Sequence, residues 1–352
     1  MVSDIRTDMF GEFEFIEKLK AHAQMAQKAA RARLTQSIGD DCAVYKNRKG
    51  NEIVITTDLL IEEIDFNLSY TSAADLGHKA FSVSASDIAA MGARALFTLI
   101  SIGVPQSAWE SGFVEEFYRG FNVQAERFHV VNIGGDISRT PKHIIVDSIM
   151  IGEVKRGHGV LRSGAHPGDL IFVSGELGGA AAGLSIINDR LNITRYLSAI
   201  KSVREEESKQ KLISRQIMPN PQLLLGLLLG QKKLASAMID ISDGLSSDIL
   251  HLCRESGVGA KIDAAAVPVD PNIYKSGLAN MANSELLNYA LNGGEDFELL
   301  FTVKPRNIRR LYRELNGINI SQIGVVTQEK GEVLIIENGK ARPLIAGGYR
   351  HF

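Results

Sequence analysis

Oxygen-bearing side chains follow an apolar run in the segment IVITTD. The run Ile53–Ile55 is β-branched and apolar, which predicts a strand. It ends in two hydroxyls and a carboxylate, those of Thr56, Thr57 and Asp58. Polar groups at the end of a buried strand need partners, and such oxygen atoms are the ligands that Mg²⁺ prefers. The segment predicts either a magnesium site or a simple turn in which Asp58 caps the next element.

Two further carboxylates follow glycines. Asp41 lies in a Gly-Asp-Asp turn before a short apolar run, which we expect to pair with the IVITTD strand and bring Asp41 near Asp58. Asp136 follows the pair Gly134–Gly135, which we expect to end a strand over His129–Ile133. Glycine lets main-chain N–H groups approach an anion closely. Both turns therefore resemble parts of a site for a cation and a phosphate.

Other carboxylates interrupt apolar elements. The spacing predicts a helix over Ala73–Gly92, with one stripe formed by Leu76, Ala80, Val83, Ser84, Asp87 and Met91. A buried carboxylate must be paired, protonated or bound to metal, and no basic residue lies near Asp87 on that stripe. Metal binding is favoured over a local hydrogen-bonding role. Asp240 lies inside an apolar strand, whereas Asp243 follows it and could simply cap the helix Ser246–Ser256.

The chain lacks the common alternatives for nucleotide or metal chemistry. Gly178–Ser185 is close to a P-loop, but Leu184 replaces the essential lysine, and no histidine pair has zinc-ligand spacing. Arg162 lies in the glycine-dotted stretch Gly157–Gly168, either as a solvated residue or as a phosphate ligand. Clustered carboxylates, next to glycines that leave main-chain N–H groups accessible, can bind several Mg²⁺ ions and a polyphosphate. The residues therefore predict a Mg²⁺-dependent nucleotide enzyme, but they do not identify its acceptor.

Composition sets the broad class. The chain has 352 residues, which suggests two domains or one large one. Its formal net charge of -2 gives no overall basic field for nucleic acid. Two cysteines imply no disulfide framework and favour a cytoplasmic location. The acidic N-terminus does not resemble a signal peptide, and the run Leu223–Leu229 is too short to span a membrane. We expect a cytoplasmic protein that binds neither nucleic acid nor membrane.

The remaining elements position these residues. We expect Gly157–Gly168 to separate an N-terminal domain, residues 1–156, from a C-terminal domain, residues 157–352. Predicted helices are Glu12–Lys20, Ala108–Glu126, Gly178–Ile187, Asn192–Gln216 and Leu223–Leu229; predicted strands include Leu96–Val104, Ile144–Val154 and Asp169–Ser174. We expect a two-domain fold of the α+β or α/β class.

Six motifs occur in one order along the chain: GDDCAV at 39–44, TTDLLIEEIDF at 56–66, SDIAAMGA at 86–93, GGDISR at 134–139, DISDGLSSD at 240–248 and GGEDFELLF at 293–301. Together they resemble the thiamine-monophosphate kinase family, over essentially the whole chain from Phe13 to Phe352. Several motifs are shared with the wider aminoimidazole-ribonucleotide-synthetase-like superfamily, whereas GGEDFELLF and the C-terminal GGYRHF are typical of the thiamine enzyme.

The resemblance implies ATP-dependent, in-line phosphorylation of thiamine monophosphate to thiamine diphosphate with several Mg²⁺ ions. It also implies a homodimer in which the N-terminal mixed sheets pair into a barrel, and an α/β C-terminal domain. The implied Mg²⁺ ligands are Asp41, Thr56, Thr57, Asp58, Asp87, Asp136, Asp240 and Asp243. The implied ATP ligands are Gly135, Asp136, Arg162 and Ser242, and the implied acceptor ligands are Glu295 and Tyr349.

One position departs from the family pattern. Asp65 replaces the histidine that usually precedes the phenylalanine of the acceptor loop. An ionised aspartate repels an acceptor phosphate unless Mg²⁺ or a lysine lies between them. Two alternatives stay open. One is another enzyme of the superfamily, such as a selenophosphate-synthetase-like protein, which needs a reactive N-terminal cysteine; Cys42 is the only candidate. The other is a regulator that binds nucleotide and Mg²⁺ without turnover.

Overall fold

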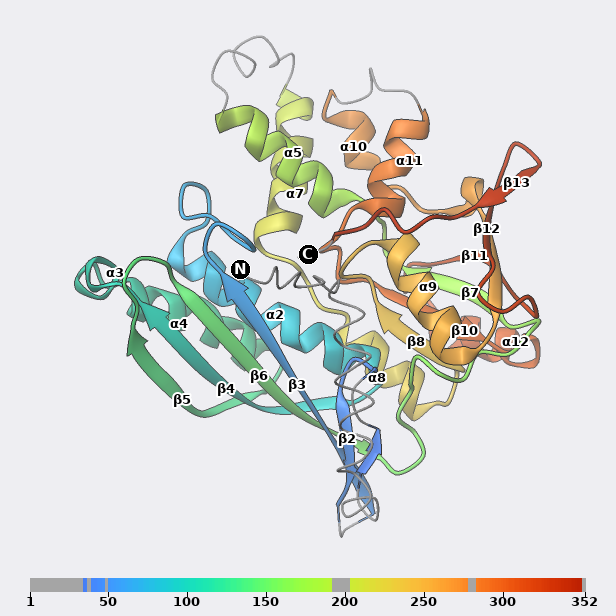
Figure 1. The fold of residues 1–352 in the computed structure, drawn as a ribbon, viewed down its shortest axis with the longest axis horizontal. Coiled ribbons are helices and arrows are strands. Elements are labelled where there is room, and N and C mark those ends of the chain that lie inside the picture. Colours follow the sequence, from blue (N-terminus) through green and yellow to red (C-terminus); the bar gives the residue numbers. More distant parts are fainter. Residues whose placement is uncertain (1–33, 37–38, 48–49, 192–202, 278–282, 350–352) are drawn as a thin grey trace, which may run out of the picture.

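The computed structural model describes residues 34–36, 39–47, 50–191, 203–277 and 283–349. The described part contains two mixed β-sheets, each flanked by helices (Figure 1). The helix predicted over 12–20 and the first part of the one predicted over 192–216 lie outside the described residues. No described helix is both long enough and apolar enough to span a bilayer.

The first sheet is built from residues 34–155. Its strand order is β1 (Leu34–Gln36), β2 (Ala43–Lys46), β3 (Asn51–Ile61), β6 (Ile145–Lys155), β4 (Arg94–Val104) and β5 (Val131–Arg139). Only β4 and β5 are parallel, so the sheet is mixed. Its helices are α2 (Ala73–Ala90), α3 (Gln106–Glu110) and α4 (Phe113–Arg127). The predicted pairing of the Asp41 strand with the IVITTD strand is confirmed, because Ala43 faces Ile55.

The second sheet is built from residues 170–343. Its order is β13 (Lys340–Pro343), β12 (Val333–Glu337), β9 (Gly259–Asp263), β11 (Ile320–Thr327), β7 (Leu170–Ser174), β10 (Leu299–Val303) and β8 (Ala237–Asp240). The α-helices of this half are α5 (Gly179–Leu191), α7 (Val203–Ile217), α8 (Leu223–Gln231), α9 (Leu245–Ser256), α10 (Pro271–Lys275), α11 (Asn283–Asn292) and α12 (Ile308–Glu314). Short 3₁₀ turns lie at 264–266 and 305–307. This two-domain α/β arrangement agrees with the predicted fold class.

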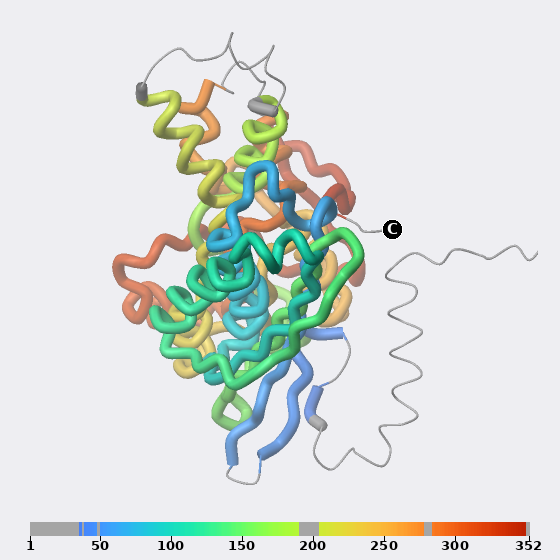
Figure 2. The backbone as a smooth tube through the Cα atoms, turned by 90° about the vertical axis from the view of Figure 1, so that its left-hand side faces the viewer, coloured from blue at the N-terminus to red at the C-terminus, as the bar shows by residue number. Residues whose placement is uncertain are grey.

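Helix α2 lies at the centre of the molecule, between the first sheet and the second half of the chain (Figure 1). Most of its side chains are buried, and its neighbours include α4, α8, β3, β6 and β8. Figure 2 shows the β2–β3 hairpin extending from one end of the molecule and α5 and α7 from the opposite end. The site predicted from the sequence therefore depends on how closely other elements approach α2.

Two expectations about the first half are wrong. The helix predicted over Ala108–Glu126 is divided into α3 and α4, because Gly112 takes a left-handed φ of 77° that ends one helix and begins the next. The strand predicted to end at Ile133 continues as β5 through Gly134 and Gly135 to Arg139. A Cβ on Gly135 would lie 1.8 Å from the Ile100 carbonyl oxygen, so the glycine allows close strand contact and does not end the strand.

Glycines in α2 and α4 set the distance between these helices. A Cβ on Gly120 would lie 1.9 Å from the Ala74 carbonyl oxygen. We expect Gly120→Ala to force α4 away from α2 and to lower the free energy of unfolding by about 1–3 kcal/mol. Chemical denaturation measures this change.

A matched control for the glycine substitution is Gly159→Ala. Its new Cβ would meet only the Val154 side chain, at an ordinary 3.5 Å. This variant should keep the wild-type free energy of unfolding. Equal stability of the two variants would contradict the importance of close packing between α2 and α4.

Candidate active site

The acidic segments converge between α2, the first sheet and β8. Carboxylate oxygens of Asp41, Asp87 and Asp240 all lie within 4.8 Å of one another. These residues come from the turn before β2, from the last turns of α2 and from the end of β8. Residues as distant in sequence as Asp41 and Asp240 therefore meet at one point.

Hydroxyl groups surround the three carboxylates. Thr56 donates from β3 to Asp87, and Ser86 Oγ donates to Asp240 Oδ2 at 2.6 Å. Asp58 lies two positions after Thr56, so it shares the face of β3 that is turned toward α2. Hydrogen bonds within the protein thus hold side chains from β3, α2 and β8 together.

The buried carboxyls have raised pKa values. Burial raises the pKa of Asp58 to about 6 and that of Asp240 to about 8, and nearby carboxylates, including Asp41, add to both shifts. Burial, followed by the charges of Asp58, Asp240 and Asp41, also raises the pKa of Asp87 well above its usual range. Without a cation the cluster therefore retains protons near neutral pH.

Two buried carboxylate oxygens in the described part of the chain lack hydrogen-bond partners and bear on whether a cation fits the cluster. Oδ2 of Asp41 and Oδ2 of Asp58 are buried and have no hydrogen-bond partner among the described residues. A buried carboxylate oxygen without a partner is costly, and a hard cation with oxygen ligands removes that cost. The donor set fits Mg²⁺, because it consists of carboxylates and hydroxyls and includes no sulfur or imidazole among the converging groups.

Arg162 reaches the same cluster from the segment that joins the two sheets. Its guanidinium donates to Asp41 Oδ1 at 2.6 Å, and its backbone N–H donates to the Asp40 carboxylate at 3.2 Å. Burial disfavours the charged guanidinium, but Asp41 more than offsets this and raises the Arg162 pKa further above its usual range. Arg162 Nε is buried without a partner among the described residues. Arg162 is therefore positioned to meet an anion beside the carboxylates.

The turn after β8 contributes mainly through its backbone. The Ser242 carbonyl accepts the Glu295 N–H at 2.7 Å, and the Asp243 carbonyl accepts the Tyr349 N–H at 3.2 Å. The Gly244 N–H donates to the Asp248 carboxylate. This turn therefore ties the GGEDF segment and the C-terminal GGY segment to the end of β8.

Thr57 and Asp136 lie away from the three-carboxylate cluster. Thr57 points to the other face of the first sheet, where its hydroxyl donates to Asp147 at 2.5 Å. Asp136 is exposed on the edge strand β5, opposite Ser101 of β4. Ser101 in turn faces Asp147 on β6. The predicted ligands therefore divide between two faces of one sheet within a single chain.

The predicted acceptor residues have separate surroundings. The Asp65 carboxylate accepts the Ile61 N–H at 2.8 Å. Glu295 pairs with the buried Lys79 at 2.6 Å. Tyr349 is half exposed and lines a cavity of about 580 Å³ beside α9, with Leu250 and Arg254. Glu295 does not line this cavity, so the side chains of Glu295 and Tyr349 face different spaces.

Sequence reasoning missed several residues at the site. Asp40 holds the Arg162 backbone, Ser86 holds Asp240, and Lys79 and Gln216 hold Glu295. Lys79 had a visible signal, because it is a charged residue among the buried positions of α2. Gln216 had none, since its partner Glu295 lies 79 positions away.

Two family models match the chain: AIR synthase related protein, N-terminal domain, over residues 39–154, and AIR synthase related protein, C-terminal domain, over residues 166–337. The chain is therefore an AIR synthase related protein over both halves. Within this class, the chain belongs to the thiamine-monophosphate kinase family. It is 34% identical over 318 residues to the Bacillus subtilis (strain 168) enzyme, covering 90% of this chain and 93% of that protein. With the Escherichia coli (strain K12) enzyme it is 33% identical over 346 residues, covering 97% and 98%.

Solved structures give the same assignment. The structure described as AaThiL complexed with AMPPCP and TMP has a TM-score of 0.80 and 31% identity, and the match covers 97% of both chains. Thiamine-monophosphate kinase from Stenotrophomonas maltophilia K279a has a TM-score of 0.71 and 29% identity, covering 95% of this chain and 98% of that one. The similarity therefore extends across both halves of the chain.

The raised carboxyl pKa values predict pH-dependent cation binding. Asp58 and Asp240 carry protons below about pH 6 and about pH 8 and lose them as the pH rises. Because protonated carboxyls are poor ligands, we expect Mg²⁺ affinity to increase between pH 6 and pH 8, with proton release. The metal-free protein should lose thermal stability over the same interval, and Mg²⁺ should restore it. Calorimetry in buffers of different ionisation enthalpy measures both affinity and proton release.

Asp87→Asn tests the same site by substitution. Removing one carboxylate from the cluster should weaken Mg²⁺ binding tenfold or more at pH 8. Asp263→Asn, on an exposed residue of β9, serves as the control and should bind like wild type. Wild-type affinity in Asp87→Asn, or no proton release in the wild-type protein, would show that the cluster is not the cation site.

Proposed function

We propose that the chain catalyses ATP-dependent phosphorylation of thiamine monophosphate to thiamine diphosphate by in-line phosphoryl transfer. The observation that carries this proposal is the convergence of Asp41, Asp87 and Asp240, together with unpartnered oxygens on Asp41 and Asp58, in a member of this kinase family. A relative bound to AMPPCP and TMP supports the same pair of substrates. Phosphoryl transfer needs positioning and charge neutralisation more than covalent chemistry.

We assign the same metal ligands that the motifs imply. Asp41, Asp87 and Asp240 converge, Thr56 donates to Asp87, and the charge of Asp58 acts on Asp87. Asp243 follows Asp240 in the adjoining turn. When bound there, Mg²⁺ supplies charge neutralisation for the phosphates. The hydroxyls of Thr56 and Ser86 hold the carboxylates in place before substrate binds, which reduces the reorganisation that binding requires. Thr57 and Asp136 would ligate from the opposite face of the first sheet.

Nucleotide binding is assigned to Arg162, Ser242, Gly135 and Asp136. Arg162 has the clearest support, because its partly buried guanidinium lies against Asp41 and has a buried Nε without a partner among the described residues. A guanidinium can donate two parallel hydrogen bonds to a phosphate while it stays paired with a carboxylate. Arg162 would therefore place a phosphate next to the carboxylate cluster.

Acceptor binding is assigned to Glu295, Tyr349 and Asp65. Glu295 offers a carboxylate to a positively charged ring, and Tyr349 offers an exposed aromatic face, a contact worth about 0.5–2 kcal/mol. Lys79 joins two of these residues, since its ammonium group donates to the Asp65 backbone carbonyl at 3.0 Å and pairs with Glu295 at 2.6 Å.

The proposal includes a homodimer in which the first sheets pair into a barrel. Strand β5 lies at the edge of its sheet and is exposed along nearly its whole length. Val131, Ile133 and Ile137 are apolar yet about half exposed on it. An exposed edge strand with apolar side chains favours pairing with another chain. Gly135 and Asp136 lie on this same edge, so pairing would place them beside residues of a second copy.

In this proposal, residues 1–156 form a domain that binds ATP and Mg²⁺ and dimerises. Residues 157–352 form an α/β domain. The contacts of Asp240 with Ser86 and of Arg162 with Asp41 join these two parts. Catalysis would therefore need both parts together.

Turnover is the direct test of the proposed function. Purified protein with ATP, Mg²⁺ and thiamine monophosphate should form ADP and thiamine diphosphate, and chelation of Mg²⁺ should abolish the reaction. Product is measured by chromatography. Binding of both substrates without product would favour a regulator, and turnover only with another acceptor would favour a different enzyme of the superfamily.

Arg162→Ala tests the nucleotide assignment. Loss of the guanidinium should raise the KM for ATP tenfold or more and change the KM for thiamine monophosphate less than threefold, because Arg162 faces the phosphate end. Arg94→Ala is the control, since it breaks the Glu153 ion pair of a largely exposed arginine on the first sheet. Equal increases in both KM values would assign Arg162 a purely structural role through Asp41.

A further inference from the structure

Lys79 is a buried cation that the sequence motifs did not assign. It lies in α2 and is only 2% exposed. Its ammonium group is 2.6 Å from Glu295 Oε1 and donates to the Asp65 carbonyl at 3.0 Å. A buried ammonium requires such partners because desolvation of an isolated charge is costly. Lys79 therefore joins the turn after β3 to the GGEDF segment of the other half.

Glu295 is held in an unusual conformation. Its φ is 66°, in the left-handed region that non-glycine residues rarely adopt, and Phe297 has a φ of 49°. Its carboxylate also accepts a hydrogen bond from Gln216 Nε2. The side chain nevertheless remains 30% exposed. Strained residues of this kind persist where surrounding contacts impose them, often at ligand sites.

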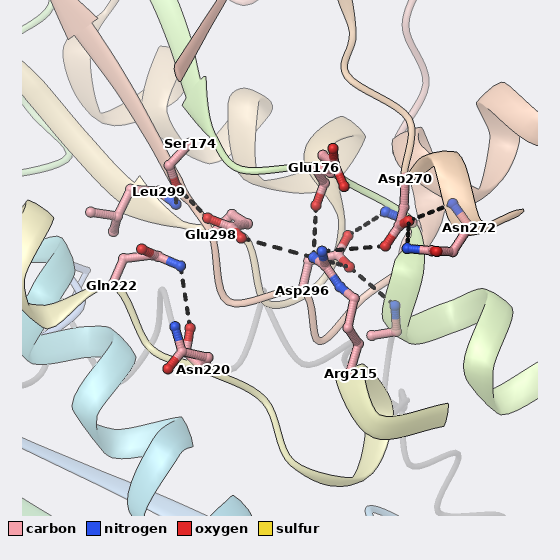
Figure 3. Close-up of polar contacts among 12 residues, drawn as sticks. Ser174, Glu176, Arg215, Asn220, Gln222, Asp270, Asn272, Asp296, Glu298 and Leu299 are labelled. Atoms are coloured by element: carbon pink, nitrogen blue, oxygen red, sulfur yellow. Dashed lines mark hydrogen bonds and ion pairs between the residues drawn. The ribbon is translucent and has the colours of Figure 1, made fainter. Parts of the chain in front are cut away.

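Helix α7 also holds this segment. Figure 3 shows Arg215, the neighbour of Gln216, reaching toward Asp296, Glu298 and Asp270. Its guanidinium is 3.2 Å from Asp296 and 3.4 Å from Asp270, and it donates to the Glu176 carbonyl at 2.7 Å. The segment 295–298 is thus fixed at Glu295 by Lys79 and Gln216, and beyond it by Arg215.

The position of Lys79 along α2 relates it to the metal cluster. Ser86, which holds Asp240, lies seven residues later and therefore on nearly the same side of the helix. At 1.5 Å per residue, the two Cα positions are about 10 Å apart along the axis. A ligand whose phosphate lies at the carboxylate cluster could therefore extend along α2 toward Glu295.

We infer that Lys79 is a positioning residue that directs the Glu295 carboxylate and so selects an acceptor with a positively charged ring and a phosphate at its far end. Lys79 does this by pairing with Glu295 from inside the protein while the carboxylate stays open on its exposed side. This inference deepens the proposed function and rests on it, because it assigns the acceptor end of the same site.

Steady-state kinetics of Lys79→Met test the inference. The KM for thiamine monophosphate should rise tenfold or more, while the KM for ATP changes less than twofold and kcat at saturation less than threefold. Glu295→Gln should give the same separation. Because the two residues would act as a unit, the double variant should be no worse than the poorer single variant. The double variant also removes both charges together, so it guards against misfolding caused by one unpaired buried charge.

Lys232→Met is the matched control. It removes another lysine–glutamate pair, that of Lys232 and Glu314 at 3.1 Å, between the end of α8 and α12. It should leave both KM values unchanged. Should Lys79→Met fail to fold, Gln216→Ala removes the other hydrogen bond to Glu295 and should raise the acceptor KM alone.

Three results would overturn the inference: an unchanged acceptor KM in the folded variants, equal increases in both KM values, or additive effects in the double variant. Wild-type turnover distinguishes failure of the proposed function from failure of the inference about Lys79. If the wild-type protein does not phosphorylate thiamine monophosphate, the proposed function fails and the inference fails with it. If wild-type turnover is present and the variants raise both KM values equally, only the inference fails.

Discussion

The structure depends on bringing several carboxylates together out of water at the junction of its two halves. Asp41, Asp87 and Asp240 repel one another when ionised, and burial increases that cost. Close contacts around α2 hold them in place nonetheless. Thr56 and Ser86 donate to two of the carboxylates and Arg162 pairs with the third. Folding therefore gathers buried carboxyl groups that retain protons, and a divalent cation can replace those protons.

Helix α2 fixes the relative positions of the residues at the site. Small residues let neighbouring backbones approach it, as at Gly226 of α8, where a Cβ would lie 2.1 Å from the Ala89 carbonyl oxygen. The C-terminal part of the helix carries Ser86 and Asp87 at the carboxylate cluster, and Lys79, two turns earlier, pairs with Glu295. A single rigid element therefore relates the two ends of the site, which makes their separation insensitive to movement of surface loops.

Local sequence patterns predicted most helices and strands, but they predicted only some of the contacts between side chains at the site. Residues 53–55 and the stripe of α2 have periodicities that follow from local sterics, so strand and helix are readable from short windows. Alternation along a strand also implies that Thr57 cannot share a face with Thr56 and Asp58, a signal that the motif-based ligand list ignored. Lys79 and Gln216 needed tertiary structure, because their shared partner Glu295 is distant in sequence.

Asp65 shows how the fold changes the meaning of a substitution within a family motif. Read from sequence, an aspartate in place of histidine adds a negative charge near an acceptor phosphate. In the structure its carboxylate accepts a hydrogen bond from the Ile61 N–H at 2.8 Å, while its backbone carbonyl accepts one from the Lys79 ammonium group at 3.0 Å. The side chain therefore stabilises the turn that ends β3, as short acidic side chains do in turns. The Lys79 ammonium contacts the backbone of Asp65 and pairs with the Glu295 carboxylate, so the local field depends on Lys79 and Glu295 as well as on Asp65.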